Sequence, residues 1–392
     1  MREVVILSAA RTPVGRFQGG LAGIPAPRLG SIAIAEAVRR AGVGPDDVDE
    51  VIMGNVLSAG LGQAPSRQAT LYAGLPTAAR STTINKMCGS GLKAVMLAQQ
   101  AIAAGDADVI VAGGMENMSA APYLLERART GYRLGDGRIV DTILRDGLTD
   151  AYQNIHMGNC AEILAREHRI SRSEQDEFAK LSYTRAIAAM DEGKIAEEIV
   201  AVEVPQTKGA AVVLSEDEEP RRVNFEKIPT LRPAFEEGGT VTAANASSIS
   251  DGGAAVVVAA AEVTKRRGWS PRARIVGQAG AAMAPEWFTI APAHATRALL
   301  EKVGWTIGDI DLIEINEAFA AVVIGVCRDL GLGYDRVNVH GGAVALGHPI
   351  GASGARILTT LLYAMPRYEA RRGVASICLA GGEAVALAIE RL

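Results

Sequence analysis

The stretch of sequence that decides the fold is residues 81–96, which read STTINKMCGSGLKAVM. Its first five residues are mostly β-branched and predict a strand, whereas apolar side chains recur at helical spacing from Gly89 to Ala104. A Gly-Ser-Gly turn separates the two patterns and places Cys88 where the strand gives way to the helix. A strand that passes abruptly into a helix is the unit from which α/β proteins are built.

The same alternation extends through the first third of the chain. Apolar runs short enough for buried strands alternate with longer runs that have the 3.6-residue spacing of a helix. Strands are expected at residues 4–8, 51–54 and 109–112, and a helix is expected at residues 29–41. The third strand is expected to end in a turn at Gly113-Gly114.

The middle of the chain has a different character. From about residue 119 to residue 248 it is more charged and irregular, which predicts an inserted loop domain. A helix is predicted within it at residues 173–192. Ser173 and Asp176 have the spacing of an N-terminal cap for that helix.

The last third of the chain repeats the first. In the same order and at a nearly constant offset, residues 47–53 match 309–315, residues 88–94 match 351–357, and residues 111–116 match 379–383. Three ordered matches indicate two copies of one α/β unit, with a site between them. The expected organisation is a first half at residues 1–118 and 249–268, a loop domain at 119–248, and a second half at 269–392.

Composition excludes several classes of function. The chain has 392 residues, more than one hydrophobic core usually holds, and its net charge of −4 leaves no broad basic field for nucleic acid or an anionic membrane. Its four cysteines include no C-x-x-C pair, so no metal site is expected. No apolar run is long enough to cross a bilayer, and the C-terminus does not match the peroxisomal signal. A cytoplasmic protein is therefore expected.

Cys88 is the first candidate for chemistry. The free N–H groups and the dipole at a helix N-terminus favour a thiolate, which is the better nucleophile. The alternative is a buried cysteine that only fills space. Residues 89–94 also fit the G-x-G-x-x-A pattern of dinucleotide-binding proteins. Dinucleotide binding is disfavoured because the acids that follow, Asp106 and Asp108, lie in a turn before the next strand.

Three further polar positions are unusual for their surroundings. His348 lies among glycines and a proline in residues 341–351, where a fixed imidazole can serve as a base or an oxyanion donor. Cys378 follows a strand-like run and precedes a Gly-Gly pair, and Asn316 ends a predicted strand. The alternatives are a structural histidine and a cysteine that packs in the core.

Together these stretches resemble the thiolase family. The resemblance extends from Arg2 to the C-terminus and rests on four motifs in family order, at residues 85–91 (NKMCGSG), 316–319 (NEAF), 347–351 (GHPIG) and 378–382 (CLAGG). It implies two similar α/β halves stacked in five layers, α-β-α-β-α, with a loop domain inserted in the first half. It also implies an acyl-CoA:acetyl-CoA C-acyltransferase that condenses two acetyl-CoA to acetoacetyl-CoA, or runs the reverse thiolysis, by ping-pong kinetics through an acyl group on Cys88.

The resemblance implies a role for each candidate. His348 activates Cys88 and helps to hold the thioester oxygen, while Cys378 is the acid/base at the α-carbon of acetyl-CoA. Asn316 positions a water in one oxyanion hole, and the N–H groups of Cys88 and Ala380 form a second. CoA is substrate and product, so no metal or redox cofactor is implied. Activation by potassium is a further expectation.

The loop domain is expected to bind CoA. His156-Met157-Gly158 is similar to a motif of short-chain acetoacetyl-CoA thiolases, and Phe288 is shared with mitochondrial-type members, some of which accept a 2-methyl branch. Arg221 resembles the arginine near the adenine and phosphates. The CoA-binding residues implied are Leu148, His156, Met157, Arg221, Ala243, Ser247, Ile249, Phe288, Ala318 and Phe319. A homotetramer, paired through residues from about 119 to 141, is also implied.

Some residues depart from the family pattern. Ala380 stands where glycine is usual, and its methyl strains the turn if φ is positive there. His340, Ser248, Glu383 and Ala384 also differ from the usual residues.

Several competing hypotheses remain. Two are enzymes of the same superfamily, a degradative 3-ketoacyl-CoA thiolase of broader chain length and a ketoacyl synthase. Two are of different classes, an inactive subunit that binds acyl-CoA and the dinucleotide-dependent oxidoreductase already disfavoured above. Cys378 argues against the synthase, and the intact set of candidate catalytic residues argues against the inactive subunit.

Overall fold

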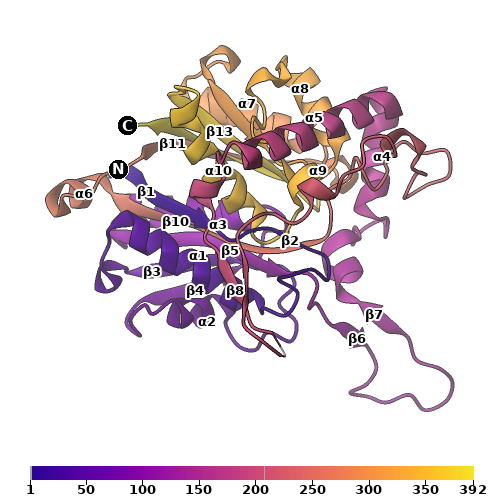
Figure 1. Cartoon of the computed structure of the whole chain (residues 1–392), viewed down its shortest axis with the longest axis horizontal. Helices are drawn as coiled ribbons and strands as arrows, with labels where there is room; N and C mark the ends of the chain where they lie inside the picture. The colour runs from indigo at the N-terminus through magenta and orange to yellow at the C-terminus, as the bar shows by residue number, and fades with distance from the viewer. Residues whose placement is uncertain (1, 207) are drawn as a thin grey trace.

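The computed structural model describes residues 2–206 and 208–392, so residue 1 of the expected first half and residue 207 of the expected loop domain lie outside the described residues. Strands from both ends of the chain form one long sheet that divides into two half-sheets (Figure 1). The first has the order β4-β3-β5-β10-β1, with β1 (Val4–Arg11), β3 (Glu50–Gly54), β4 (Arg80–Ile84), β5 (Val109–Asn117) and β10 (Ser250–Ala260). The second has the order β12-β13-β14-β11, with β11 (Ala273–Ala282), β12 (Leu312–Ile315), β13 (Arg372–Leu379) and β14 (Glu383–Arg391).

The two half-sheets have the same plan. In the first, β3 is parallel to β4 and β5, and β10 is antiparallel to β5 and β1. In the second, β12 is parallel to β13, and β14 is antiparallel to β13 and β11. A parallel bridge between Ile313 and Val337 takes the place of β4. The predicted internal repeat is thus confirmed, and the halves meet where Val5 and Ile6 of β1 pair with β11.

Helices form three layers around the half-sheets. The outer layers are α1 (Ala26–Ala41) with α2 (Pro65–Tyr72), and α7 (Ala291–Val303) with α8 (Ala320–Leu330). The middle layer contains α3 (Ser90–Ala104) and α10 (Ser353–Arg367). In it, Val95 and Leu358 from these helices pack against Ile110 and Ile377 from the two half-sheets. The expected five-layer α-β-α-β-α arrangement is confirmed, with each half-sheet covered on both faces.

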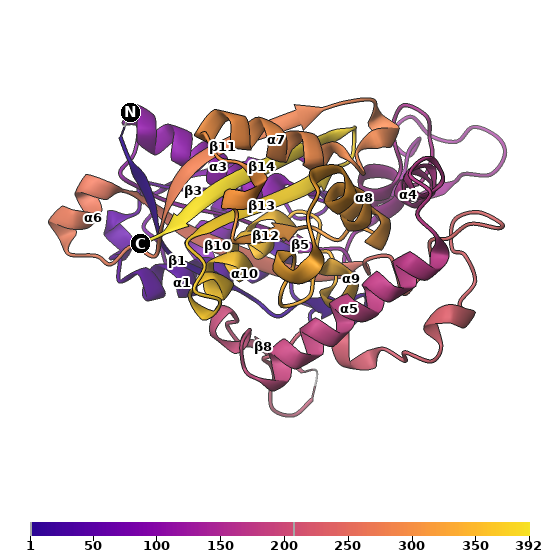
Figure 2. The ribbon, with the colours of Figure 1, turned by 90° about the horizontal axis from the view of Figure 1, so that it is seen from above.

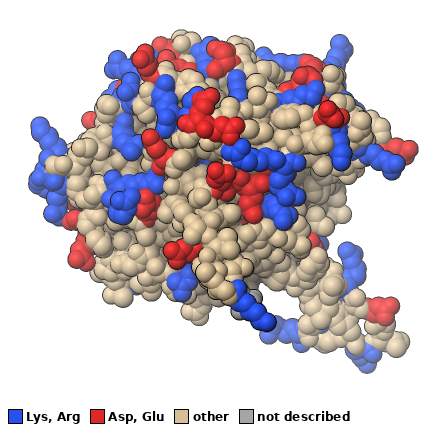
Figure 3. Space-filling model, in the orientation of Figure 1, with Lys and Arg blue, Asp and Glu red and all other residues tan. Residues whose placement is uncertain are grey.

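The segment between β5 and β10 lies partly across the second half. Leu164 of α4 (Met157–Glu167) shares an apolar cluster with Val323 of α8, and the long α5 (Arg172–Asp191) crosses in front of α9 (Ala343–Leu346) in Figure 2. The β6–β7 hairpin (Tyr123–Leu125 and Ile139–Asp141) projects from the body at the lower right of Figure 1. Figure 3 shows cationic and anionic side chains interspersed over the visible face.

The remaining elements are short. They are β2 (Gly15–Arg16), which pairs with β10, the hairpin of β8 (Val202–Val204) and β9 (Val212–Leu214), α6 (Ala261–Arg267), a π-helical turn at Ile143–Leu148, and single 3₁₀ turns at Pro45–Asp47, Ala196–Glu198, Pro220–Arg222, Ile228–Thr230, Pro285–Trp287, Ile307–Asp309 and Tyr334–Arg336. Within the described part of the chain, no helix has both the length and the apolar character needed to cross a bilayer.

Two local predictions are wrong. β5 runs on to Asn117 instead of ending at Gly113-Gly114, and these glycines serve close packing: a Cβ would lie 2.0 Å from the carbonyl oxygen of Ala254 or of Gly351, respectively. The cap of α5 is Ser171 with Glu174, which form a complete capping box two residues before the predicted pair Ser173 and Asp176. Both serines have an acidic residue three positions later, so the spacing rule alone could not choose between them.

Candidate active site

A cavity of about 370 Å³ lies where the segments before α3 and α10 meet the inserted segment. Its wall is mostly apolar, and its polar groups are a thiol, two imidazoles and a few hydroxyls. Most of the site residues expected from the sequence line it: Cys88, Leu148, His156, Met157, Ala243, Ser247, Ile249, Phe288, Ala318, Phe319, His348 and Ala380. A mostly apolar cavity with a few convergent polar groups is the usual form of a small-molecule site.

Three expected residues do not line this cavity. Asn316 is fully buried behind His348, with its amide nitrogen 3.5 Å from Nε2 of the ring. Cys378 is also buried, and burial together with the nearby Cys88 raises the pKa of its thiol. Arg221 lies elsewhere, half-exposed and paired with Asp191 at 2.7 Å. The structure therefore brings the catalytic candidates together but leaves Arg221 outside.

The turn before α3 holds Cys88 partly exposed to the cavity. The preceding Met87 has a φ of 46°, and a Cβ at Gly89 would lie 2.1 Å from Leu379, so the turn is pressed against the end of β13. The expected lowering of the thiol pKa at a helix N-terminus is opposed here by burial. Burial raises the pKa of the Cys88 thiol to about 12, although the N–H groups of Ala380 and Cys88 itself oppose the shift.

His348 is held by the backbone on one side and by a hydroxyl on the other. Its backbone N–H donates to the carbonyl of Ser248 at 3.1 Å, and its ring Nδ1 lies 2.6 Å from Oγ of Ser353. The preceding Gly347 has a φ of 103°, and a Cβ there would lie 2.2 Å from Oγ of Ser250. Burial, aided by the charge of Arg356, lowers the pKa of His348 to about 3. The ring is therefore neutral at physiological pH and can accept a proton.

A buried carboxylate fixes the segment that follows His348. Glu116, at the end of β5, accepts the N–H of Gly351 at 2.9 Å and the N–H groups of Val56 and Leu57 at 3.0 and 3.1 Å. Burial raises its pKa to about 7 against these hydrogen bonds. Glu116 thus ties the first half to the catalytic segment of the second half.

Three of the departures from the family pattern, Ala380, Glu383 and His340, have defined surroundings. Ala380 has no positive φ, unlike Gly381 and Gly382 after it, so its methyl causes no backbone strain and its N–H still faces Cys88. Glu383 forms an ion pair with Lys86, two residues before Cys88. His340 is buried against Tyr368, with ring centroids 5.7 Å apart, and lies outside the cavity.

The far end of the cavity is aromatic. His156 caps α4, its Nδ1 accepting the N–H of Gly158 at 3.0 Å, so Nε2 carries the proton of the neutral ring. Burial lowers the pKa of His156, which keeps it neutral. Its ring stacks on Phe235 at 4.8 Å, and Phe235 meets Phe319 edge-on at 6.1 Å. These rings bound one end of the cavity.

Sequence reasoning missed part of this wall. The additional lining residues are Met118, Leu144, Gly147, Ala234, Phe235, Thr242, Ala246, Ser248 and Ile350. Phe235 lies in an irregular segment with no motif around it. The nearest signal was Gly158, where a Cβ would lie 2.3 Å from the Phe235 ring, but that contact appears only in three dimensions.

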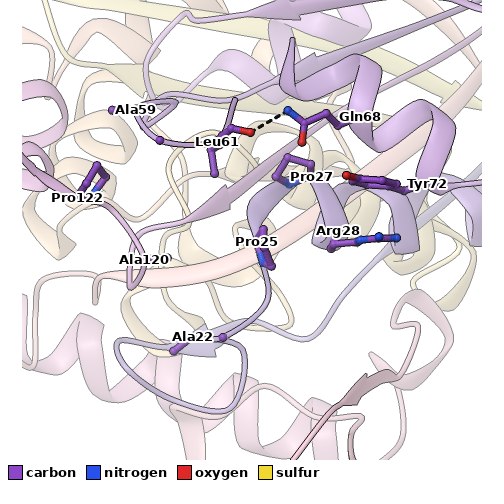
Figure 4. A pocket seen from close by; sticks show the side chains of 12 residues that line it. Ala22, Pro25, Pro27, Arg28, Ala59, Leu61, Gln68, Tyr72, Ala120 and Pro122 are labelled. Atoms are coloured by element: carbon purple, nitrogen blue, oxygen red, sulfur yellow. Dashed lines mark hydrogen bonds between the residues drawn. The ribbon is translucent and has the colours of Figure 1, made fainter. Parts of the chain in front are cut away.

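A second hollow of about 460 Å³, between the start of α1 and α2, lacks comparable chemistry (Figure 4). Its charged lining residue, Arg28, lies 3.6 Å over the ring of Tyr72, and Gln68 donates to the carbonyl of Leu61 at 2.8 Å. These polar groups already have partners. Across residues 2–206 and 208–392, no group of three or more His, Cys, Asp or Glu side chains is placed to share a metal ion.

Comparisons with known proteins agree with the fold and with the motifs. The family models "Thiolase, N-terminal domain" and "Thiolase, C-terminal domain" match residues 4–262 and 269–391. An acetyl-CoA acetyltransferase from Cupriavidus necator is 54% identical over 392 residues and covers 100% of both chains. Mitochondrial acetyl-CoA acetyltransferase A from Xenopus laevis is 52% identical over 393 residues, covering 100% of this chain and 93% of that one.

Two solved structures are also similar. The acetyl-CoA acetyltransferase of Bacillus anthracis has a TM-score of 0.98 and 43% identity, covering 100% of this chain and 99% of that chain. A thiolase from Ascaris suum in complex with coenzyme A has a TM-score of 0.95 and 43% identity, covering 100% of each. The chain belongs to the thiolase family.

Proposed function

We propose that this chain is an acetyl-CoA C-acetyltransferase, which condenses two acetyl-CoA to acetoacetyl-CoA and CoA and also runs the reverse thiolysis. One observation carries the proposal: a single short cavity holds the Cys88 thiol, the neutral His348 and the N–H of Ala380. The curated relatives with this name are about half identical over the whole chain.

The first half-reaction is acyl transfer to Cys88. Its sulfur attacks the thioester carbonyl of acetyl-CoA as the thiol proton passes to His348. The N–H groups of Cys88 and Ala380 are placed to hold the developing oxyanion. As the C–S bond to CoA breaks, the Cys378 thiol gives its proton to the leaving sulfur, and CoA departs as a free thiol.

The second half-reaction forms the carbon–carbon bond. The Cys378 thiolate removes an α-proton from the next acetyl-CoA, and its raised pKa suits so weak a carbon acid. The enolate carbon attacks the acetyl group on Cys88, and the departing Cys88 sulfur recovers its proton from His348. Both cysteines and the imidazole thereby return to their starting protonation states.

The size of the cavity favours short acyl groups over the broader-chain alternative. Phe235, Phe288 and Phe319 all line this cavity, whose whole volume is about 370 Å³. The second cysteine, Cys378, is unsuited to a ketoacyl synthase, and the unstrained Ala380 removes the main argument for an inactive subunit.

Further properties follow from the same proposal. Residues 119–248 bind CoA and make the oligomer contacts, with Arg221 turning from Asp191 toward the CoA phosphates. The β6–β7 hairpin, with Leu134 fully exposed and Ile139 69% exposed, pairs dimers into a tetramer. Potassium activation and a cytoplasmic location also belong to the proposal. Equal activity in sodium and potassium buffers would remove the potassium component.

The decisive experiment is thiolysis of acetoacetyl-CoA by free CoA, followed by loss of enolate absorbance. Wild type should be active, Cys88→Ala and Cys378→Ala should be silent, and Cys327→Ala, which removes a buried thiol outside the cavity, should remain active. A longer 3-oxoacyl-CoA run in parallel should react more slowly. If the wild type binds CoA yet is as silent as the two cysteine variants, the chain is the inactive subunit instead.

A further inference from the structure

A row of buried polar side chains lies between β12 and α10, behind the catalytic cavity. Glu314 lies on β12 and Asn316 directly follows its last residue. Ser353 and Arg356, three residues apart, lie on one face of α10. His348 stands between the two elements. Its Nδ1 is 2.6 Å from Oγ of Ser353, and its Nε2 is 3.5 Å from the amide nitrogen of Asn316.

The partners of Ser353 favour one direction for its hydrogen bonds. Its Oγ also lies 3.0 Å from the carbonyl oxygen of Pro349, which can only accept. With the single hydroxyl proton donated to Pro349, which also accepts the N–H groups of Ala352 and Ser353, Oγ accepts from the ring. This places the proton of neutral His348 on Nδ1 and leaves the lone pair on Nε2. The amide nitrogen of Asn316, 3.5 Å from Nε2, is a donor and fits the same tautomer.

We propose that Ser353 is a positioning residue, which holds His348 as the Nδ1–H tautomer so that Nε2 can take the Cys88 proton. The inference rests on the proposed function. No carboxylate contacts the ring among its described hydrogen-bond partners, in contrast to the Ser-His-Asp arrangement. The buried Arg356 also disfavours a lasting imidazolium. A neutral hydroxyl thus orients the ring without storing a charge there, and the proton on Nε2 is readily returned.

The test compares Ser353→Ala with Ser353→Thr and with a matched control. Thr359 lies on the same helix, is equally buried, and its hydroxyl donates to the carbonyl of Ala355 at 2.8 Å without touching His348. Thr359→Ala therefore loses the same kind of helix bond but keeps the catalytic contact. Ser353→Cys is a second probe, because it preserves the volume while sulfur is a weak acceptor.

Two readouts are needed. The first is the steady-state kinetics of thiolysis, which give kcat and KM. The second is the rate at which iodoacetamide alkylates Cys88, with the alkylated residue identified by mass spectrometry. For Ser353→Ala, kcat and the alkylation rate should each fall about 10- to 100-fold, as losses of orienting partners do elsewhere, with little change in KM. Both rates should also fall in Ser353→Cys. Ser353→Thr should have most of the wild-type kcat and alkylation rate, and Thr359→Ala should have both at the wild-type level.

Equal rates for Ser353→Ala and wild type would overturn the inference, as would a folded Ser353→Thr no faster than Ser353→Ala. If Ser353→Ala does not fold, Ser353→Cys with wild-type rates would overturn it in the same way. Failure of the proposed function looks different: the wild type would lack thiolysis, while the alkylation series would still report on Ser353.

Discussion

Gly114→Ala is the sharpest test of how the two halves cooperate at the site. Gly114 of β5 in the first half faces the carbonyl of Gly351, three residues after His348 in the second half. A Cβ at 114 would lie 2.0 Å from that oxygen, where contacts below 3.0 Å do not occur, so the two backbones must separate by about 1 Å. A displacement of that size near a catalytic group costs about 10²-fold in rate. Overpacking should also lower the free energy of unfolding by about 1–3 kcal/mol.

The measurement is kcat for thiolysis together with thermal unfolding. The control is Gly23→Ala, because a Cβ at Gly23 meets nothing within 4 Å and its φ is not positive. We expect the control to keep wild-type activity and stability, and Gly114→Ala to lose both. If Gly114→Ala matched the control in both measurements, the proposed coupling of β5 to the His348 segment would be incorrect.

Three further perturbations have defined outcomes. Phe235→Ala removes the ring that stacks on His156, so KM for acetoacetyl-CoA should rise and longer 3-oxoacyl-CoA should react relatively faster; unchanged selectivity would contradict this. Arg11→Met leaves two buried carboxylates, Glu198 and Asp217, without their cation. The free energy of unfolding, measured with denaturant, should therefore fall by about 3–5 kcal/mol. An unchanged free energy of unfolding would show that this ion-pair network does not stabilise the fold. Burial raises the pKa of Glu314 to about 8, so its contribution to stability is present at low pH and declines as pH rises toward 8. Glu314→Gln should therefore unfold at a higher temperature relative to wild type at pH 8 than at pH 5, and a constant difference would refute the assignment.

The architecture could be predicted from the sequence because the apolar pattern of the strands and helices is periodic and occurs in both halves of the chain. Strand and helix periods, together with three ordered matches, were enough for two similar halves. Cys88, His348 and Ala380 stood in recognisable motifs and do meet at one cavity. Local ambiguity caused the errors at Gly113-Gly114 and at the α5 cap, where two structures satisfied the same rule.

The parts of the site that sequence could not supply depend on distant packing. The turn at Cys88 sits at a helix N-terminus as expected, but residues from β13 pack against it, and burial raises the pKa of the thiol. Phe235 lines the cavity from an irregular segment, where no periodic pattern predicts which way a side chain points. Ser353 is unremarkable as a helical serine until its 2.6 Å contact with His348 is seen.

The contact between Glu116 and Gly351 has a consequence for how such a chain evolves. Gly351 is the counterpart of Cys88 in the repeat, yet a Cβ at that position would lie 2.6 Å from a carboxylate oxygen of Glu116. The second copy therefore has no room for a nucleophile of its own. Gene duplication and fusion would have offered two equivalent reaction centres, and the asymmetry at these matched positions restricts each polypeptide to one. A cysteine at position 351 would require the loss of the Glu116 carboxylate, which holds the segment that carries His348.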